Sequence, residues 1–333
     1  MTARSRVLLI GLGSTTQTAL DALVERFEVC GLVRPGDDAV VNQAVGIGIP
    51  VSDRTSLAAI ADQVESAAPD AVVVSSFDRI LPAGLVAAVP FVNVHYAPLP
   101  RYRGRATVNW AILNGEPATA ITVHCLEPDL DAGGILAQRS VPIGDRTTTG
   151  GLYDELNALQ RSILADAVER RLSGDRGVAQ DESGASYSCT RVPDDGEIRW
   201  GDSTVAIDRL VRALDGPFPP AFTFLGSQRI DVRAARPVLD APVYDGRIPG
   251  RVVRVDRSGG AVDVLTGDGV LRLLTVSVTA DRPVTAASVI TSVRSTLVSR
   301  FEARVTDLEG RLEALQNLGS SAFQDNHQFK ETS

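Results

Sequence analysis

Short apolar runs alternate with amphipathic stretches along the first half of the chain. Three runs have the length and continuity of buried parallel strands, namely residues 6–10, 27–33 and 70–75. Between them, the stretches from Ala19 to Val24 and from Ser56 to Ser66 place apolar side chains at the three- and four-residue spacing of a helix. Strands and helices in alternation predict an α/β domain built on a parallel sheet.

The second half of the chain has a different pattern. Residues 152–171 predict one long helix, and the polar, glycine-rich residues 173–186 predict a loop. From about residue 229 to 278, short strands are separated by turns that contain glycine, which is typical of a small β-barrel. We therefore expect a first domain over residues 1–188, a linker over 189–204, and a second domain over 205–290.

Apolar residues recur at alternating steps of four and three near the carboxyl end of the chain. They are Phe301, Val305, Leu308, Leu312 and Leu315. This spacing predicts a helical tail over residues 291–318 with a coiled-coil-like seam, which docks either on its own domain or on a second copy of the chain as a homodimer. Residues 319–333 are expected to be disordered.

Composition narrows the function classes. The net charge of −8 argues against a dominant nonspecific nucleic-acid surface, although a local basic patch remains open. The three cysteines are widely spaced and include no CxxC pair, which predicts a reducing compartment and no zinc site. The chain has no export signal and no apolar run near the roughly twenty residues that span a membrane, so we expect a cytoplasmic protein.

The stretch from Phe91 to Asp131 holds the candidate chemistry. Asn93 and His95 end an apolar run, so on a strand their side chains share one face. A proline- and arginine-rich loop follows, and an acidic cluster spans Glu127 to Asp131. A lone histidine after an apolar run is more often structural. Here, however, the neighbours supply a hydrogen-bond donor, a titratable base and a carboxylate to orient it, which is the equipment for acyl transfer.

Four ordered motifs carry a specific resemblance. They are Asn93-Val94-His95, LPRYRG from Leu99 to Gly104, WAILNGE from Trp110 to Glu116, and LDAGGIL from Leu130 to Leu136. In order and spacing they resemble the 10-formyltetrahydrofolate-dependent formyltransferase family, most closely over residues 70 to 140. The resemblance implies an α/β, Rossmann-like formyltransferase domain with a parallel sheet, followed by a small OB-like β-barrel domain. The helical tail is longer than is usual in the family.

The resemblance also implies the site. Asn93, His95 and Asp131 would be catalytic: Asn93 and a protonated His95 would stabilise the developing oxyanion, and Asp131 would orient His95. The co-substrate would be 10-formyltetrahydrofolate, with no metal. Its binding residues would be Arg79, Ile80, Leu81, Ala97, Pro98, Leu99, Pro100, Arg105, Glu127, Pro128, Asp129 and Leu130. Ala97 and Pro98 stand where the family has Ser and Leu, which removes a hydroxyl from this loop. His124 is interpreted as structural.

Other interpretations of the chain are weaker or remain open. Gly11-x-Gly13 after the first strand could belong to a dinucleotide site, but Thr16 replaces the third glycine. Residues 34–51 lack the basic insertion with which methionyl-tRNA formyltransferases contact the acceptor stem. We therefore predict a small-molecule amine acceptor, either a nucleotide amino sugar or a hydroxyornithine-type amine. The alternatives are methionyl-tRNA and, in another class, a catalytically idle folate- or nucleotide-binding module.

Overall fold

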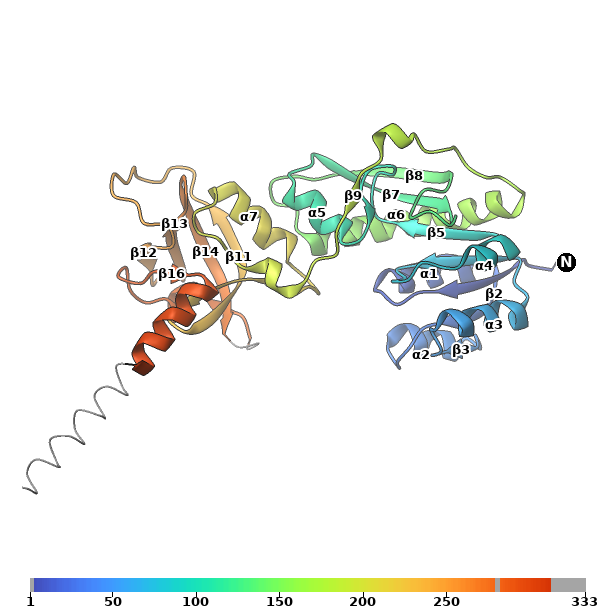
Figure 1. Ribbon diagram of the computed structural model, residues 1–333, viewed down its shortest axis with the longest axis horizontal. Coiled ribbons are helices and arrows are strands. Elements are labelled where there is room, and N and C mark those ends of the chain that lie inside the picture. Colours follow the sequence, from blue (N-terminus) through green and yellow to red (C-terminus); the bar gives the residue numbers. More distant parts are fainter. Residues whose placement is uncertain (1–2, 279–281, 313–333) are drawn as a thin grey trace, which may run out of the picture. The chain divides into compact units, whose positions relative to one another are not determined.

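The computed structural model describes residues 3–278 and 282–312 (Figure 1). The chain divides into two compact units, Met1–Arg191 and Val192–Ser333. Within the described ranges, no helix is both long enough and apolar enough to cross a membrane.

The first unit is built on one mixed sheet. Its strands are β1 (Arg6–Ile10), β2 (Glu28–Val33), β3 (Val51–Ser52), β4 (Ala71–Ser75), β5 (Phe91–His95), β7 (Ala118–Cys125) and β8 (Ile135–Pro142), in the order β3-β2-β1-β4-β5-β7-β8. The strands from β1 to β5 pair in parallel, which confirms the predicted α/β class. β7 runs antiparallel to β5, and β8 antiparallel to β7. The sequence pattern predicted neither this reversal nor β8.

Helices cover both faces of this sheet because its strands are apolar on both sides. The helices are α1 (Thr15–Val24), α2 (Ala39–Gly46), α3 (Leu57–Ala67), α4 (Ala83–Ala88), α5 (Thr107–Leu113) and α6 (Thr149–Leu172). Leu8 and Ile10 of β1 face a cluster with α3 and α4, while α1 packs beside α6. The chain reverses its direction of winding at β1, between β2 and β4. Ligands bind at the carboxyl edge near such a switch point.

A short parallel ladder lies outside the main sheet. It joins β6 (Arg103–Gly104) to β9 (Tyr187–Ser188), which follows the 3₁₀ turn η1 (Glu182–Gly184). The segment after α6, predicted as a loop, thus returns to the loop that follows β5.

The second unit is a curled antiparallel sheet. Its strands are β10 (Ala221–Leu225), β11 (Gln228–Pro237), β12 (Val252–Asp256), β13 (Ala261–Leu265), β14 (Val270–Val278), β15 (Val284–Thr285) and β16 (Leu297–Val298), in the order β12-β13-β14-β11-β10-β16 with β15 on β14. A bridge between Arg251 and Thr296 draws the two ends of this path together. The turn η2 (Pro193–Gly196) precedes the sheet, and α7 (Thr204–Ala213) and α8 (Ala286–Val289) complete the unit around a shared apolar core.

Of the helical tail predicted over residues 291–318, the structure describes residues 291–312. Residues 300–312 are helical, but Leu297–Val298 form β16, so the helix begins later than predicted. The Arg300 guanidinium donates to both carboxylate oxygens of Asp194, at 2.8 and 2.9 Å, and Ala303 is only 4% exposed. The predicted seam faces outward, because Phe301 is 77% and Leu312 56% exposed. Leu315 and the predicted disordered residues 319–333 lie outside the described ranges.

The loop between β7 and β8 depends on Gly133. A Cβ built there would lie 1.9 Å from the carbonyl oxygen of Cys125, whereas one built at Gly84 in α4 meets no described atom within 4 Å. We therefore expect Gly133→Ala to lower the free energy of unfolding by roughly 2–4 kcal/mol. Gly84→Ala should raise it by up to about 1 kcal/mol. Urea unfolding checks both, and equal effects would contradict the prediction.

Candidate active site

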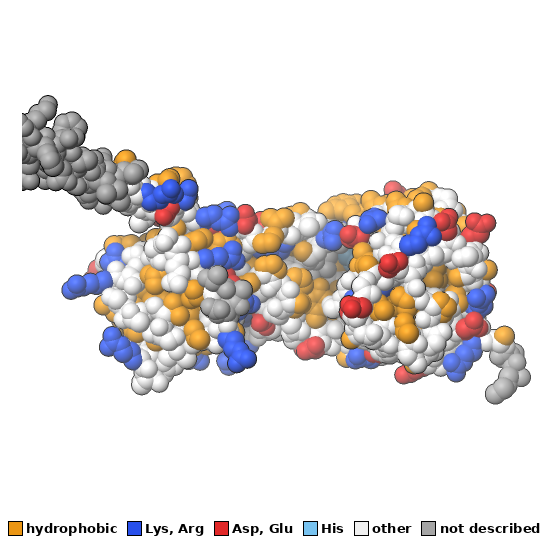
Figure 2. All heavy atoms as spheres, turned by 90° about the horizontal axis from the view of Figure 1, so that it is seen from below, with side chains coloured by type: hydrophobic (Ala, Val, Ile, Leu, Met, Phe, Trp, Pro, Cys, Tyr) orange, Lys and Arg blue, Asp and Glu red, His pale blue; other side chains and the backbone are white. Residues whose placement is uncertain are grey.

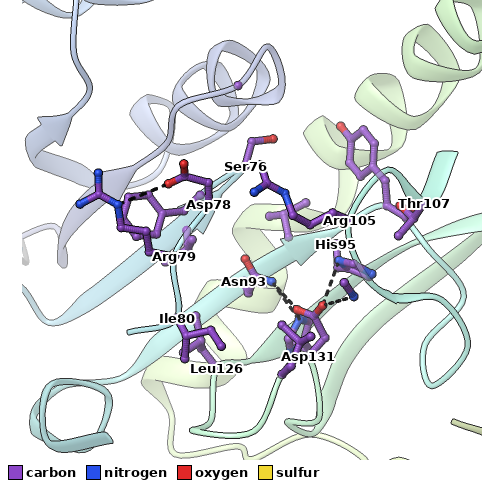
Figure 3. Close-up of a pocket in the computed structure, with 18 of the residues that line it drawn as sticks. Ser76, Asp78, Arg79, Ile80, Asn93, His95, Arg105, Thr107, Leu126 and Asp131 are labelled. Carbon is purple, nitrogen blue, oxygen red and sulfur yellow. Dashed lines mark hydrogen bonds and ion pairs between the residues drawn. The ribbon is translucent and has the colours of Figure 1, made fainter. Parts of the chain in front are cut away.

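A cavity of about 790 Å³ opens in the first unit at the carboxyl ends of β4 and β5 (Figure 3). Loops from several parts of the chain line it. They include Leu12–Gly13 after β1, Ser76–Leu81 after β4, Gly104–Thr107 after β6, Leu126–Asp131 after β7, and Ser188–Thr190 after β9. The cavity therefore lies where the α/β sheet topology places a ligand.

Asn93 and His95 point into this cavity from β5, as their alternation along the strand predicts. In the register between β5 and β7, Asn93 lies opposite His124 and His95 opposite Thr122. His95 is largely buried, and its Nε2 lies 2.8 Å from the backbone oxygen of Tyr102. Its Nδ1 lies 3.6 Å from Oδ2 of Asp131. Acceptors thus face both ring nitrogens, the arrangement required by a ring with two N–H groups.

The Asp131 carboxylate is the centre of the cluster (Figure 3). Its Oδ1 accepts a hydrogen bond from Asn93 Nδ2 at 3.3 Å, and its Oδ2 accepts one from the Gly104 backbone N–H at 2.9 Å. Burial alone would raise the pKa of this carboxyl. The charge of His95, together with the hydrogen bonds that the carboxylate accepts, outweighs burial and holds the pKa of Asp131 well below its usual range.

His124 belongs to the same cluster, although the sequence suggested only a structural role. Its side chain is 1% exposed, and its Nε2 lies 3.1 Å from Asn93 Nδ2 and 3.6 Å from Asp131 Oδ1. Its Nδ1 donates to the Cys125 carbonyl at 2.8 Å, which leaves Nε2 to accept from Asn93. His124 thereby fixes which way the Asn93 amide points. Only the register between β5 and β7 reveals this contact.

Backbone strain is concentrated around the cavity. Among the described residues, five that are not glycine have positive φ, and all except Ala68 belong to this region. Ser76, Ala106 and Asp131 line the cavity, and Tyr102 supplies the carbonyl that faces His95. Such conformations cost about 1–3 kcal/mol each and persist only where the surrounding contacts hold them, which is typical of functional sites.

The residues expected to bind folate fall into two groups. Those that line the cavity are Arg79, Ile80, Leu81, Arg105, Glu127, Pro128, Asp129 and Leu130. Ala97, Pro98, Leu99 and Pro100 do not line it. The Ala97 carbonyl accepts from Thr122 Oγ1 at 2.6 Å and the Leu99 carbonyl from Gln138 Nε2 at 3.0 Å, so this loop is fastened to β7 and β8.

The glycine loop after β1 is closed by a buried arginine. Nη1 of Arg34 donates to the carbonyls of Gly11 and Gly13 at 3.1 and 3.0 Å, and its Nε bonds Asp38 at 2.9 Å. A Cβ on Gly11 would lie 2.2 Å from Oγ1 of Thr16. These glycines therefore serve close packing, and an arginine stands where a dinucleotide site would carry its ribose-binding acid.

Several lining residues carry no signal in the sequence. They are Ser76, Thr107, Tyr153, Ser188, Cys189 and Thr190. Ser188 ends the expected first domain, and Cys189 and Thr190 begin the expected interdomain linker. Among the described residues, no three His, Cys, Asp or Glu side chains are arranged to hold a metal ion.

Comparisons with known proteins agree with this site. The family model described as formyl transferase matches residues 39–168, and the one described as its C-terminal domain matches residues 192–294. A methionyl-tRNA formyltransferase of Roseiflexus sp. (strain RS-1) is 33% identical over 302 residues, which are 85% of this chain and 90% of that relative.

Solved structures share the fold. HypX from Aquifex aeolicus in complex with tetrahydrofolic acid matches with a TM-score of 0.62 at 19% identity, over 87% of this chain and 48% of HypX. This chain thus spans about half the length of HypX. WlaRD, a sugar 3N-formyl transferase crystallised with dTDP and 5-N-formyl-THF, matches with a TM-score of 0.62 at 14% identity, over 84% of this chain and 99% of WlaRD.

The α/β unit, with its cavity at the carboxyl edge of the sheet, matches a family model for enzymes that transfer a formyl group. The matches to both family models and the 33% identity over most of the chain narrow this class. The chain belongs to the formyltransferase family, and its predicted membership is confirmed.

The lowered pKa of Asp131 predicts a pH-dependent stability. Since the pKa of the carboxyl is about 3.9 in the unfolded chain and lower in the folded protein, its contribution to stability is complete above about pH 5 and is lost as the pH falls. The free energy of unfolding of the parent should therefore fall with acid more steeply than that of Asp131→Asn. The difference in slope should reach about 1.4 kcal/mol per pH unit below pH 4. Thermal or urea unfolding between pH 6 and 3 measures the difference. Parallel profiles would contradict it.

Proposed function

We propose that this formyltransferase moves the formyl group of 10-formyltetrahydrofolate to an amino group of a small metabolite. The observation that carries the transfer chemistry is the convergence of Asn93, His95 and Asp131 in one cavity. A nucleotide amino sugar is the leading acceptor, and a hydroxyornithine-type amine is close behind. The intact cluster argues against a catalytically idle binding module.

The cavity suits a folate. Its volume lies within the 300–1,000 Å³ range of small-molecule sites. The Ile80 side chain, 65% exposed, and Leu130 offer apolar surface at the cavity that a pterin ring would cover. Arg105 forms no ion pair with any described residue, so its guanidinium is available for the glutamyl carboxylates of folate. HypX and WlaRD, which share this fold, were crystallised with folates.

The side chains divide the chemistry among them. As the amine attacks the formyl carbon, the formyl oxygen gains negative charge, and the amide of Asn93 and a ring N–H of His95 are the nearby donors. The Asn93 amide already donates to His124 and Asp131, so one of these hydrogen bonds is exchanged for the substrate oxygen. A proton on the His95 ring passes to the departing nitrogen as its bond to the formyl carbon breaks, and the ring takes up the proton that the attacking amine loses. Asp131 holds the ring in place.

The region after β2 supports a small acceptor. Residues 35–53 contain no lysine or arginine, and the cation before them, Arg34, is buried and bonded to Asp38. Figure 2 shows basic and acidic side chains interspersed over the first unit on the face drawn. Because phosphate contacts dominate nucleic-acid affinity, this part of the catalytic unit offers little attraction to an acceptor stem.

Methionyl-tRNA is the second candidate acceptor. It is favoured by the 33% identity to a methionyl-tRNA formyltransferase over 90% of that relative, and by the match to the family's C-terminal domain. The two candidates differ only in the amine, so one assay separates them.

We expect formyl transfer from 10-formyltetrahydrofolate to at least one small amine, read as a mass shift of the acceptor. The panel contains nucleotide amino sugars, hydroxyornithine and charged initiator methionyl-tRNA. Asn93→Ala, His95→Ala and Asp131→Ala should each lower turnover by about 10²–10³-fold while the protein stays folded. Asn42→Ala in α2, outside the cavity, is the matched control. Formylation of the tRNA alone would overturn the small-acceptor proposal, and normal turnover in folded His95→Ala would overturn the catalytic assignment.

We further propose that the tail pairs two copies of the chain. The exposed side chains of Phe301, Val305, Leu308 and Leu312 follow the alternating steps of a self-pairing coiled coil. Light scattering should give the mass of a dimer for the full chain and of a monomer after deletion of residues 300–333. Leu308→Glu should also dissociate the dimer, whereas Glu309→Gln on the same helix should not. An unchanged mass after the deletion would refute the proposal.

A further inference from the structure

A segment between the two regions matched by the family models takes part in the site. Residues 178–190, here called the strap, follow α6 and lie between the matches at 39–168 and 192–294. Their sequence predicts a loop and a linker. In the structure, Ser188 to Thr190 line the cavity, while the earlier part of the strap contacts the loop after β5 and the loop that carries Asp131.

The strap is joined to the loop that faces His95. Through β9 and β6 it pairs with Arg103–Gly104, and Ser186 accepts hydrogen bonds from the Tyr102 and Arg103 backbone N–H groups at 3.0 and 2.8 Å. Tyr102 supplies the carbonyl beside His95 Nε2, and Gly104 the N–H that binds Asp131. The strap therefore holds both backbone groups that the catalytic side chains use.

Gln180 of the strap connects this loop to the Asp131 loop. Its Nε2 donates to the carbonyls of Asp131 and Gly133, at 2.7 and 2.8 Å. Its Oε1 accepts from Nη2 of Arg103 at 2.9 Å. Arg103 is 2% exposed and also pairs with both carboxylate oxygens of Glu182 in the strap. The amide of Gln180 thus bridges a buried arginine and the backbone of the catalytic acid.

The backbone of Asp131 needs such support. Its φ of 51° is unfavourable for a residue with a side chain, so the loop persists only where neighbouring contacts hold it. The two hydrogen bonds from the Gln180 amide fix the peptide planes that carry the Asp131 and Gly133 carbonyls. The orientation of these planes determines where the Asp131 carboxylate points. The Gln180 side chain supplies both bonds, although it does not line the cavity.

We propose that Gln180 is a positioning residue that places the Asp131 carboxylate for formyl transfer. The inference rests on the proposed function, because it assigns a role in that reaction. Gln180→Glu keeps the shape of the side chain but replaces the donating NH₂ with an oxygen that faces two carbonyls. A misplacement of about 1 Å in a catalytic group costs on the order of 10²-fold. We expect turnover to fall by about 10–100-fold, while binding of 5-formyltetrahydrofolate, measured by calorimetry, changes less than about threefold.

The matched control is Gln63→Glu. Gln63 in α3 also donates from Nε2 to two backbone carbonyls, those of Arg54 and Ala59, both at 3.0 Å, and it lies outside the cavity. It should keep the turnover of the parent. Gln180→Ala, which adds no charge, should lower turnover in the same direction as Gln180→Glu. This second variant separates loss of the two hydrogen bonds from repulsion by a carboxylate.

A double-mutant cycle separates positioning from general weakening of the fold. If Gln180 acts through Asp131, Gln180→Glu should lower single-turnover rates in the parent but have little further effect in Asp131→Asn. A multiplicative loss in both backgrounds, or full activity of folded Gln180→Glu, would overturn the role. These outcomes leave the proposed function intact, because the parent is active in each. A parent that formylates no amine in the panel would overturn the proposed function and the positioning role together.

Discussion

The arrangement of the first unit around its cavity depends on stabilising the buried carboxylate of Asp131. A negative charge removed from water is costly unless charges and donors surround it. Here Asn93 and His95 come from β5 and the Gly104 N–H comes from the loop after β5, while Asp131 itself follows β7. Each must keep its place for the charge to remain, so the order of strands β5 and β7 and the path of the loop are tied to one carboxylate.

Holding these groups together requires backbone conformations that the residues would not choose alone. Tyr102 and Asp131 both have positive φ, and neither is glycine. The hydrogen bonds of the strap and the packing of Gly133 against Cys125 act on the same two loops. The strained residues and the contacts that hold them thus lie in the same two loops. This is expected where a site is held in the geometry that its substrate requires.

The sequence predicted which side chains share a face of β5, but not which side chains of neighbouring elements they contact. Alternation along β5 was enough to put Asn93 and His95 on one side, and the resemblance to formyltransferases supplied Asp131. The place of His124 in the cluster was not predicted, because its contact with Asn93 depends on the antiparallel register between β5 and β7. The loop from Ala97 to Pro100 was expected at the folate but bonds β7 and β8, and such long-range hydrogen bonds leave no periodic signal. The contacts of Gln180 could not be predicted for the same reason, because the composition of this stretch predicts only a loop.

The separation between chemistry and acceptor follows from where each is built. The groups proposed to be catalytic lie on adjacent strands and strained loops, where a change of one residue disturbs several partners. Much of the rest of the cavity wall is made of connecting segments, such as Phe77–Leu81 and Cys189–Thr190, which can vary at little cost to the sheet. A shared centre with a variable wall is consistent with similar proteins that are named for methionyl-tRNA and for a sugar. For this chain, two features favour the smaller acceptor. Residues 35–53 contain no lysine or arginine, and the Arg34 guanidinium is already hydrogen-bonded to the carbonyls of Gly11 and Gly13. This part of the sheet edge therefore offers little positive charge to a phosphate backbone.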